Sequence, residues 1–351
     1  AFLVEHHLLM SHLAQHRDLN DDALLQRFAR TVGDVERLRA LYLLTVADMR
    51  AVGPHVWTDW KAALLAELYF KARRILEGGS WRADAAVRIE EVQDAVRQGL
   101  QGVFKTREIE AYLDSLDPSY FLANPPEAIA EHLRVAEGMG EAPLATRVMH
   151  RPREGYSELL VCTRDRPGLF AMIAGVLATH GINILGAQIF TRTNGLVVDV
   201  LQVDSPTEGA ILDDARWRGA LGSLRDVLTG AVSVEALIAR RRRPSVLRPK
   251  VRPPVATRVR IDNEASERYT VLDIYTRDRI GLLYDITHTL FAKGLNIYLA
   301  RVTTHIDQAA DVFYVEQSGG GKITGPARLQ AIRQALLQAL EGDAIDAPAP
   351  F

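Results

Sequence analysis

The stretch TRDRPGLFAMIAGVLATHGINILGAQIFT, residues 163–191, occurs a second time in the chain as TRDRIGLLYDITHTLFAKGLNIYLARVTT, residues 276–304. The two stretches carry the same amino acid at 13 of 29 positions. The similarity resumes with DVLQV at 199–203 and DVFYV at 311–315. Self-similarity of this extent indicates two copies of one structural unit.

Each copy has the pattern of a strand, a turn and a helix. A run rich in β-branched and aromatic residues predicts the first strand, and the polar turn Thr-Arg-Asp-Arg-X-Gly follows it. Apolar residues three and four positions apart then predict a helix, and a glycine ends it because glycine readily adopts the left-handed conformation. In the first copy, Asn194-Gly195 predicts a hairpin between two further strands. The expected first strands are 156–162 and 269–275, and the expected closing helices are 208–229 and 324–341.

A last strand, expected at 232–238 in the first copy, completes the split βαβ pattern of ferredoxin-like folds. In the second copy, the residues after Glu341 are too rich in proline for a good strand. Residues 257–261 precede that copy and can fill its vacant sheet edge, and residues 145–149 can play a similar part for the first copy. We therefore expect an α+β chain with two ferredoxin-like βαββαβ domains.

Both copies resemble the ACT domain, a regulatory module that binds amino acids. The resemblance rests on Asp-Arg-Pro-Gly-Leu at 165–169 followed by Gly-Ile-Asn-Ile at 181–184, and on the corresponding residues of the second copy. It covers about 156–238 and 269–341. It implies a ligand at an interface between two such domains.

The turn before the helix offers groups that match both ends of an amino acid. A helix N-terminus leaves backbone N–H groups free and favours a carboxylate, and a glycine in the turn lets a ligand come close. An aspartate in the turn can pair with an α-ammonium group, or it can cap the helix instead. An asparagine in the next strand can bind a ligand or simply finish a turn. The candidate ligand-binding residues are Asp165, Arg166, Gly168 and Asn183 in the first copy and Asp278, Arg279, Gly281 and Asn296 in the second.

The first 80 residues have helical periodicity. Leu38, Leu41, Thr45, Asp48 and Val52 fall on one stripe at intervals of three and four residues, so we expect Asp48 to point toward a core. A buried carboxylate is costly unless it is paired or bound to a metal. The pattern alone leaves both roles of Asp48 open.

Three blocks of this region closely resemble the second half of the HD phosphohydrolase domain in the family of bifunctional uridylyltransferase/uridylyl-removing enzymes of bacterial nitrogen control. The blocks are HHLLMSHLAQHRDL at 6–19, LRALYLLTVADMR at 38–50 and WTDWKAALLAELY at 57–69. DPSYFLANPPEAIAEH at 117–132 is also like the family. With the two ACT-like copies, the resemblance covers essentially the whole chain, and it implies an HD-type helical remnant followed by two ACT domains.

The resemblance implies a function and its partners. In this family, the HD domain removes uridylyl groups from the PII signal protein with a divalent metal, Mg or Mn, and UTP is the donor for their addition. Glutamine is the allosteric ligand of the ACT pair. His7 and Asp48 match metal-site residues, and bound metal activates water. The His-Asp dyad of the HD domain and the nucleotidyltransferase domain have no match here, so we expect a fragment that has no complete catalytic set and is inactive alone.

The composition sets further bounds. The chain has 351 residues, a formal net charge of −2 and one cysteine, Cys162. These values fit a cytoplasmic protein with no general attraction to nucleic acid, and no apolar run is long enough for a bilayer. The basic, proline-rich stretch at 240–254 lacks aromatic residues for base stacking and favours a solvated linker. The expected parts are 1–80 (half an HD domain), 81–142 (a helical connector), 143–240 (the first ACT domain), 241–255 (the linker) and 256–345 (the second ACT domain).

Two other functions remain open at this point. One is a stand-alone ACT regulator that senses some amino acid beside a vestigial helical domain. The other is another HD–ACT phosphohydrolase, such as a guanosine-tetraphosphate hydrolase, although such enzymes usually carry a single ACT domain at the end. Which amino acid binds, and whether both copies bind it, is not decided by the sequence.

Overall fold

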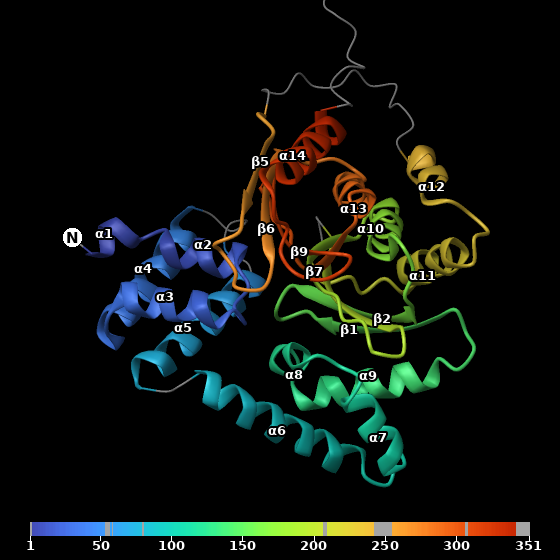
Figure 1. Cartoon of the computed structure of the whole chain (residues 1–351), viewed down its shortest axis with the longest axis horizontal. Coiled ribbons are helices and arrows are strands. Elements are labelled where there is room, and N and C mark those ends of the chain that lie inside the picture. The colour runs from blue at the N-terminus through green and yellow to red at the C-terminus, as the bar shows by residue number, and fades with distance from the viewer. Residues whose placement is uncertain are drawn as a thin grey trace, which may run out of the picture. The chain divides into compact units, whose positions relative to one another are not determined.

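The computed structural model describes residues 2–52, 57, 59–78, 81–205, 209–241, 255–305 and 308–341. The chain divides into two compact units. The first is formed by Ala1–Arg164 and Phe190–Val200, and the second by Asp165–Ile189 and Leu201–Phe351. Figure 1 shows the elements of both units in chain order. The boundary falls inside the first repeat, so the turn that begins at Asp165 and the helix that follows it belong to the second unit.

The first unit opens with helices around one apolar core. The buried side chains of this core include Met10, Leu25, Phe28, Leu41 and Leu65, and their burial supplies the main favourable term in folding this region. The expectation of a helical first 80 residues is confirmed for the part that the structure describes. The helices are α1 (Phe2–His6), α2 (Leu9–His16), α3 (Asp22–Val32), α4 (Val35–Val52) and α5 (Asp59–Leu76).

The orientation expected for Asp48 is wrong. On α4, Leu38, Leu41, Thr45 and Met49 are buried, whereas Asp48 is exposed. After Thr45 the next buried residue is Met49, four positions later, whereas the stripe expected from the sequence continues three positions later to Asp48. A step of four residues stays closer to the same face of an α-helix than a step of three, because one turn takes about 3.6 residues. Asp48 therefore faces solvent and is not a paired core carboxylate.

Four more helices of the first unit lead from this core to the repeats. Pro118 and Pro126 stand at the first positions of α8 and α9, where the missing N–H of proline costs no intrahelical bond. The helices are α6 (Trp81–Leu100), α7 (Thr106–Leu113), α8 (Pro118–Ala123) and α9 (Pro126–Gly138).

The first unit also contains the opening hairpin of the first repeat. Strands β1 (Leu144–Arg151) and β2 (Tyr156–Arg164) pair antiparallel, from Leu144 opposite Thr163 to Arg151 opposite Tyr156. The prediction that 145–149 fills a sheet edge is confirmed. The Asn-Gly turn is confirmed too: Gly195 has φ 75°, its N–H donates to the carbonyl of Arg192 at 2.9 Å, and strand β4 (Leu196–Asp204) follows.

One arginine joins this turn to the helices before it. Arg192 is buried, and its Nε donates to the Ser115 hydroxyl at 2.8 Å. Its guanidinium carbon also lies 4.5 Å from the centre of the Tyr112 ring, a distance at which a cation and an aromatic face attract. The backbone N–H of Thr193 donates to the carbonyl of Ser115 at 3.0 Å. The first repeat is thus tied to the end of α7.

In the second unit, five strands form one antiparallel run across both repeats. β3 (Asn183–Gln188) pairs with β7 (Leu295–Arg301), with Gly186 opposite Arg301. The run continues through β9 (Gln308–Gln317) and β6 (Thr270–Arg277) to β5 (Arg258–Asp262), and the short β8 (Thr304–His305) pairs with β9. Two copies of the repeated fold therefore share a sheet through their β3 and β7 strands.

Each repeat takes its outer strand from the residues that precede it. β5 pairs antiparallel with β6, from Arg258 opposite Tyr275, which confirms the prediction for 257–261. The ferredoxin-like class is confirmed, but the order in each repeat is ββαββα, and the strand expected at 232–238 is wrong. These residues enter helix α12 (Val234–Arg241), because the Ser233 hydroxyl accepts from the Ala236 N–H at 3.2 Å as a helix cap and Val234 and Ile238 are both buried four positions apart.

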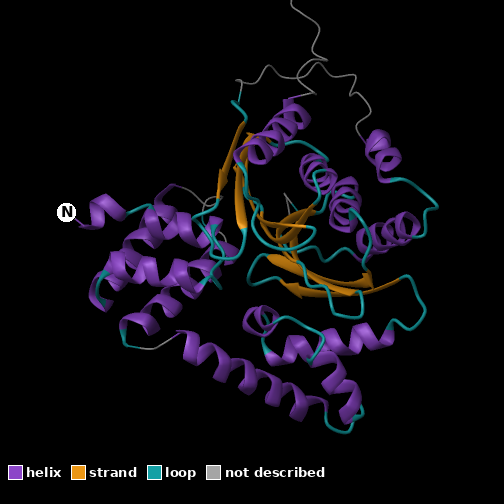
Figure 2. Ribbon diagram, viewed as in Figure 1, coloured by secondary structure: helices purple, strands orange, loops and turns teal. Residues whose placement is uncertain are grey.

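The helices of the second unit gather along one side of its strands (Figure 2). The first helix of each repeat packs against that of the other, α10 against α13, and α10 also packs against α11 and α12. α13 packs against α14, and α14 against β5. The closing helices expected at 208–229 and 324–341 are confirmed with later starts. The bounds are α10 (Leu169–Thr179), α11 (Asp214–Leu228), α13 (Leu282–Ala292) and α14 (Pro326–Glu341).

Candidate functional site

Both copies of the strand-to-helix turn have the same backbone. Gly168 has φ 73° and stands before α10, and Gly281 has φ 81° and stands before α13. The left-handed conformation favours glycine at these two positions. The N-cap residue of each helix is this glycine, which has no side chain to cap it, so neither Asp165 nor Asp278 stands at the N-cap position. Both aspartates are exposed, and the Asp278 carboxylate accepts from the backbone N–H of Arg279.

The two turn arginines bind the ends of the closing helices. Arg166 Nη1 donates to the carbonyl of Leu228, the last residue of α11. Arg279 Nη2 donates to the carbonyl of Ala339, in the last turn of α14, at 3.5 Å. Helix C-termini attract cations because their last carbonyls have no intrahelical partner. Each arginine thus fixes the turn of its repeat to the closing helix of the same repeat.

The two asparagines begin the next strand of each repeat. Asn183 is exposed and opens β3. Its side chain hydrogen-bonds to the carboxyl group of Asp204, whose pKa burial raises to about 6. Asn296 is exposed and lies opposite Glu316 in the pairing of β7 with β9. Asn183 therefore has a partner within its own repeat.

A cavity of about 290 Å³ opens beside the first turn. Its wall has three parts, all within the second unit. The turn and first helical turn of α10 contribute Pro167, Gly168, Ala171 and Met172; the end of α11 and start of α12 contribute Val227, Gly230, Val232, Ser233, Val234 and Glu235; and α13 of the other repeat contributes Tyr284, His288 and Phe291.

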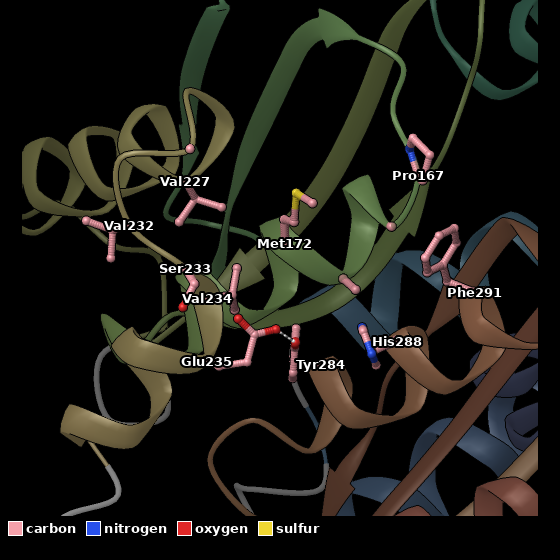
Figure 3. Close-up of a pocket in the computed structure, with 13 residues that line it drawn as sticks. Pro167, Met172, Val227, Val232, Ser233, Val234, Glu235, Tyr284, His288 and Phe291 are labelled. Atoms are coloured by element: carbon pink, nitrogen blue, oxygen red, sulfur yellow. Dashed lines mark hydrogen bonds between the residues drawn. The ribbon is translucent and has the colours of Figure 1, made fainter.

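Figure 3 shows how these side chains meet. Glu235 and Tyr284 point toward one another, and the Tyr284 hydroxyl donates to the Glu235 carboxylate. This hydrogen bond holds the pKa of Glu235 below its usual range. His288 lies next to them on α13, and Phe291 lies close to the turn, 3.4 Å from the position a Cβ would take on Gly168. The cavity is thus mostly apolar with one carboxylate in its lining, as ligand sites commonly are.

The second turn has different neighbours. The residues that correspond to Ala171 and Met172 in the second repeat are Tyr284 and Asp285. Tyr284 extends toward Glu235, and the Asp285 carboxylate forms an ion pair with Arg279 Nη1. A small side chain and a flexible one therefore line the first turn, whereas the corresponding pair in the second repeat is a large ring and a charged group.

The sequence-predicted ligand residues are only partly brought together. Gly168 lines the cavity, and the other seven candidates do not belong to its described lining. Their ligand roles stay predictions. Sequence reasoning missed Ser233, Glu235, Tyr284 and His288, which supply the polar groups of the cavity. The available signal was the difference between Ala171 and Tyr284 in otherwise similar helices, which places a small side chain after the first turn and a large one after the second.

The two candidate metal residues are both at the surface. His7 is exposed, and its Nδ1 lies 2.8 Å from the carbonyl oxygen of Val4; Asp48 is exposed on α4. Across the part of the chain that the structure describes, no group of three or more His, Cys, Asp or Glu side chains is placed to hold a metal ion. The arrangement of His7 and Asp48 alone does not fit a catalytic metal site, which needs three protein ligands. The basic stretch at 242–254 lies outside the described residues.

Comparison with known proteins identifies both repeats. Residues 157–216 match the family described as "ACT domain", and residues 258–343 match the family described as "ACR9-like, ACT-like domain". The resemblance of both repeats to ACT domains is confirmed. Among helices in the described part of the chain, none is long and apolar enough to cross a membrane.

The whole chain is similar to longer proteins named "Bifunctional uridylyltransferase/uridylyl-removing enzyme". Identity is 38% to the protein of Gluconobacter oxydans (strain 621H), over 99% of this chain and 37% of that protein. It is 38% to the protein of Azospirillum brasilense, over 97% of this chain and 36% of that protein. The chain thus spans a little over a third of the length of these relatives. An aspartate kinase from Synechocystis aligns at 16% identity with a TM-score of 0.30, over 63% of this chain and 32% of that one, and carries no argument.

Proposed function

We propose that this chain is the glutamine-sensing regulatory portion, with part of an HD domain, of an enzyme that uridylylates and deuridylylates the PII signal protein. The observation that carries the proposal is the cavity beside Gly168, which lies where the first helices of the two ACT repeats meet. The names of the relatives support the parent activity and do not favour a stand-alone regulator or a guanosine-tetraphosphate hydrolase.

The cavity suits a small zwitterion with an uncharged side chain. Gly168 precedes the N-terminus of α10, where a carboxylate finds free backbone N–H groups. Apolar side chains such as Met172, Val232 and Phe291 cover most of the remaining wall. The described lining holds the Glu235 carboxylate but no lysine or arginine. A second carboxylate in the ligand side chain would be repelled there, which favours glutamine over glutamate.

Glutamine binding would regulate the two activities through the contacts of the first ACT repeat with the helical connector. Glutamine would favour one arrangement of the repeats, suppress uridylylation and promote uridylyl removal. Such coupling between sites is typically worth about 1–3 kcal/mol. The contact of Arg192 with Ser115 and Tyr112 supports a mechanical link between the first ACT repeat and the helical connector.

We further propose the domain limits 1–80, 81–142, 143–240 and 256–345, joined by the linker 241–255, and a cytoplasmic location. PII and UTP are the proposed partners of the parent enzyme, with Mg or Mn as its divalent metal. His7 and Asp48 are proposed contributors to the metal site, together with ligands from outside this chain. This chain alone is proposed to have neither activity.

Calorimetric titration of the full chain with L-glutamine tests the proposal. We expect saturable heat with L-glutamine and at least tenfold weaker binding of L-glutamate. L-alanine serves as a control that has the same charged groups and no amide. Absence of heat with L-glutamine, from protein shown to be folded by circular dichroism, would contradict the assignment. Equal affinity for glutamine and glutamate would instead limit it to amino-acid sensing in general.

A further inference from the structure

We propose that Glu235, supplied by α12 and held by Tyr284 of the other repeat, is the residue that binds the α-ammonium group of the amino acid. This inference rests on the proposed sensing function and names the chemistry of its site. Glu235 carries the only carboxylate in the described lining of the cavity. A ligand ammonium group inside the cavity therefore has one anionic partner there.

The position of the Glu235 side chain is fixed from two sides. Glu235 lies in the first turn of α12, two residues after the capping residue Ser233. The Tyr284 hydroxyl on α13 donates to one carboxylate oxygen (Figure 3). A side chain whose rotamer is already held loses little conformational entropy when it binds a ligand. The anchor is thus prepared before the ligand arrives.

The charge state of Glu235 also suits a cation. The pKa of its carboxyl group is lowered first by the hydrogen bond from Tyr284 and then by its own backbone N–H, with smaller contributions from Ser233 and His288. The group is therefore ionised at neutral pH. A carboxylate has about four acceptor positions, so the hydrogen bonds from Tyr284, Ser233 and the backbone leave room for an ammonium donor.

The geometry favours Glu235 over the aspartate to which the sequence pointed. Asp165 is exposed and does not belong to the described lining of the cavity, although Gly168, three residues later, does. Glu235 lies on a segment where the sequence predicted a strand, so sequence reasoning did not bring it to the site. The two acidic residues make different predictions for the same ligand, and an experiment can separate them.

The test compares two ligands on three proteins. L-glutamine and 4-carbamoylbutanoate, which is glutamine without its α-ammonium group, are titrated calorimetrically into the full wild-type chain, Glu235→Gln and Asp165→Asn. Glu235→Gln keeps the size of the side chain and an acceptor for the Tyr284 hydroxyl. Glu235 is exposed, so we expect the variant to fold. We expect Glu235→Gln to weaken L-glutamine binding about tenfold, as loss of a charge-assisted hydrogen bond does, and to change binding of the analogue less than twofold. Asp165→Asn is expected to leave both affinities within twofold of wild type.

The outcomes separate this inference from the function on which it rests. If wild-type protein binds L-glutamine but Glu235→Gln binds it equally well, the inference is overturned and the sensing function stands. A selective loss of L-glutamine binding in Asp165→Asn assigns the ammonium group to Asp165 and also overturns it. If the wild type binds 4-carbamoylbutanoate as tightly as glutamine, no residue recognises the ammonium group and the inference fails. If folded wild-type protein binds no glutamine, the proposed function fails, and this inference fails with it.

Discussion

The two Asp-Arg-X-Gly turns have the same backbone conformation but different neighbouring side chains. Gly168 and Gly281 have nearly the same φ, 73° and 81°, and each turn arginine binds the end of a closing helix. Yet Ala171 and Met172 line a cavity beside the first turn, whereas Asp285 pairs with Arg279 beside the second. The comparison teaches that the motif fixes the conformation of the turn, and that the residues one helical turn later set the size and charge of the side chains beside it.

A second difference lies in how closely another helix can approach. A Cβ on Gly175 of α10 would lie 2.3 Å from Val234 Cγ1 of α12 and 3.0 Å from Tyr284 Cδ2 of α13. The corresponding residue of α13 is His288. Gly175 therefore lets α12 and Tyr284 pack against α10 and brings Glu235 to the cavity.

Grafting the second turn onto the first gives the largest expected effect. Ala171→Tyr combined with Met172→Asp places a ring and a charge where the cavity now has a buried methyl group and a thioether. We expect glutamine affinity to fall at least about a hundredfold, about 2.7 kcal/mol, because the ring occupies the cavity and the new carboxylate lies near that of the ligand. Calorimetry measures the affinity, and urea unfolding checks that the protein is folded.

Two single variants serve as controls for this double variant. Met172→Asp alone changes a half-buried position and is expected to fold and to bind at least about tenfold more weakly. Asp285→Met makes the reverse change in the second repeat, where it is expected to lower the free energy of unfolding by about 1 kcal/mol through the lost ion pair and to leave affinity unchanged. Loss of binding in Asp285→Met, with normal binding in Met172→Asp, would reverse the assignment of the two turns.

Gly175→Ala tests the close approach of α12. Because the new methyl group would overlap Val234, we expect α12 to move and the unfolding free energy to fall by about 1–3 kcal/mol, as in other overpacked sites. Glutamine affinity is expected to fall about tenfold as Glu235 moves with α12. Gly222→Ala on α11 is the matched control, since nothing lies within 4 Å of its Cβ position and alanine favours a helix by up to about 1 kcal/mol. Equal behaviour of the two variants in urea unfolding and calorimetry would show that α12 does not depend on Gly175.

The sequence predicted the repeated fold well because local patterns determined it. Apolar runs, glycines at helix ends and an Asn-Gly turn predicted most strands and helices. The edge strands near 145–149 and 257–261 were predicted as well. The prediction for 232–238 was wrong because a short segment with Val232, Val234 and Ile238 suits either periodicity in the sequence, and the cap at Ser233 favours the helix. The cavity could not be predicted, since it depends on how α10, α12 and α13 pack across distant parts of the chain.

The two strand-opening asparagines give the smallest expected difference between the repeats. Burial raises the pKa of Asp204 to about 6, against 3.8 for the free group, and Asn183 hydrogen-bonds to the carboxyl group and lowers that pKa. The folded state therefore holds the proton more tightly between about pH 4 and 6. Above pH 6 the carboxylate is ionised and destabilises the fold, and the Asn183 hydrogen bond offsets part of this cost.

Asn183→Ala is accordingly expected to lower the unfolding free energy by about 1 kcal/mol at pH 8. The loss should shrink as the pH falls through 6, because protonation of Asp204 in the folded state removes the charge that Asn183 stabilises. Asn296→Ala, at the corresponding exposed position of the second repeat, should show no such change with pH. Urea unfolding of both variants at pH 8 and pH 4.5 measures the difference. If Asn183→Ala lowers the unfolding free energy equally at both pH values, Asn183 does not stabilise the Asp204 carboxylate. Asn183 would then again be a candidate for ligand binding.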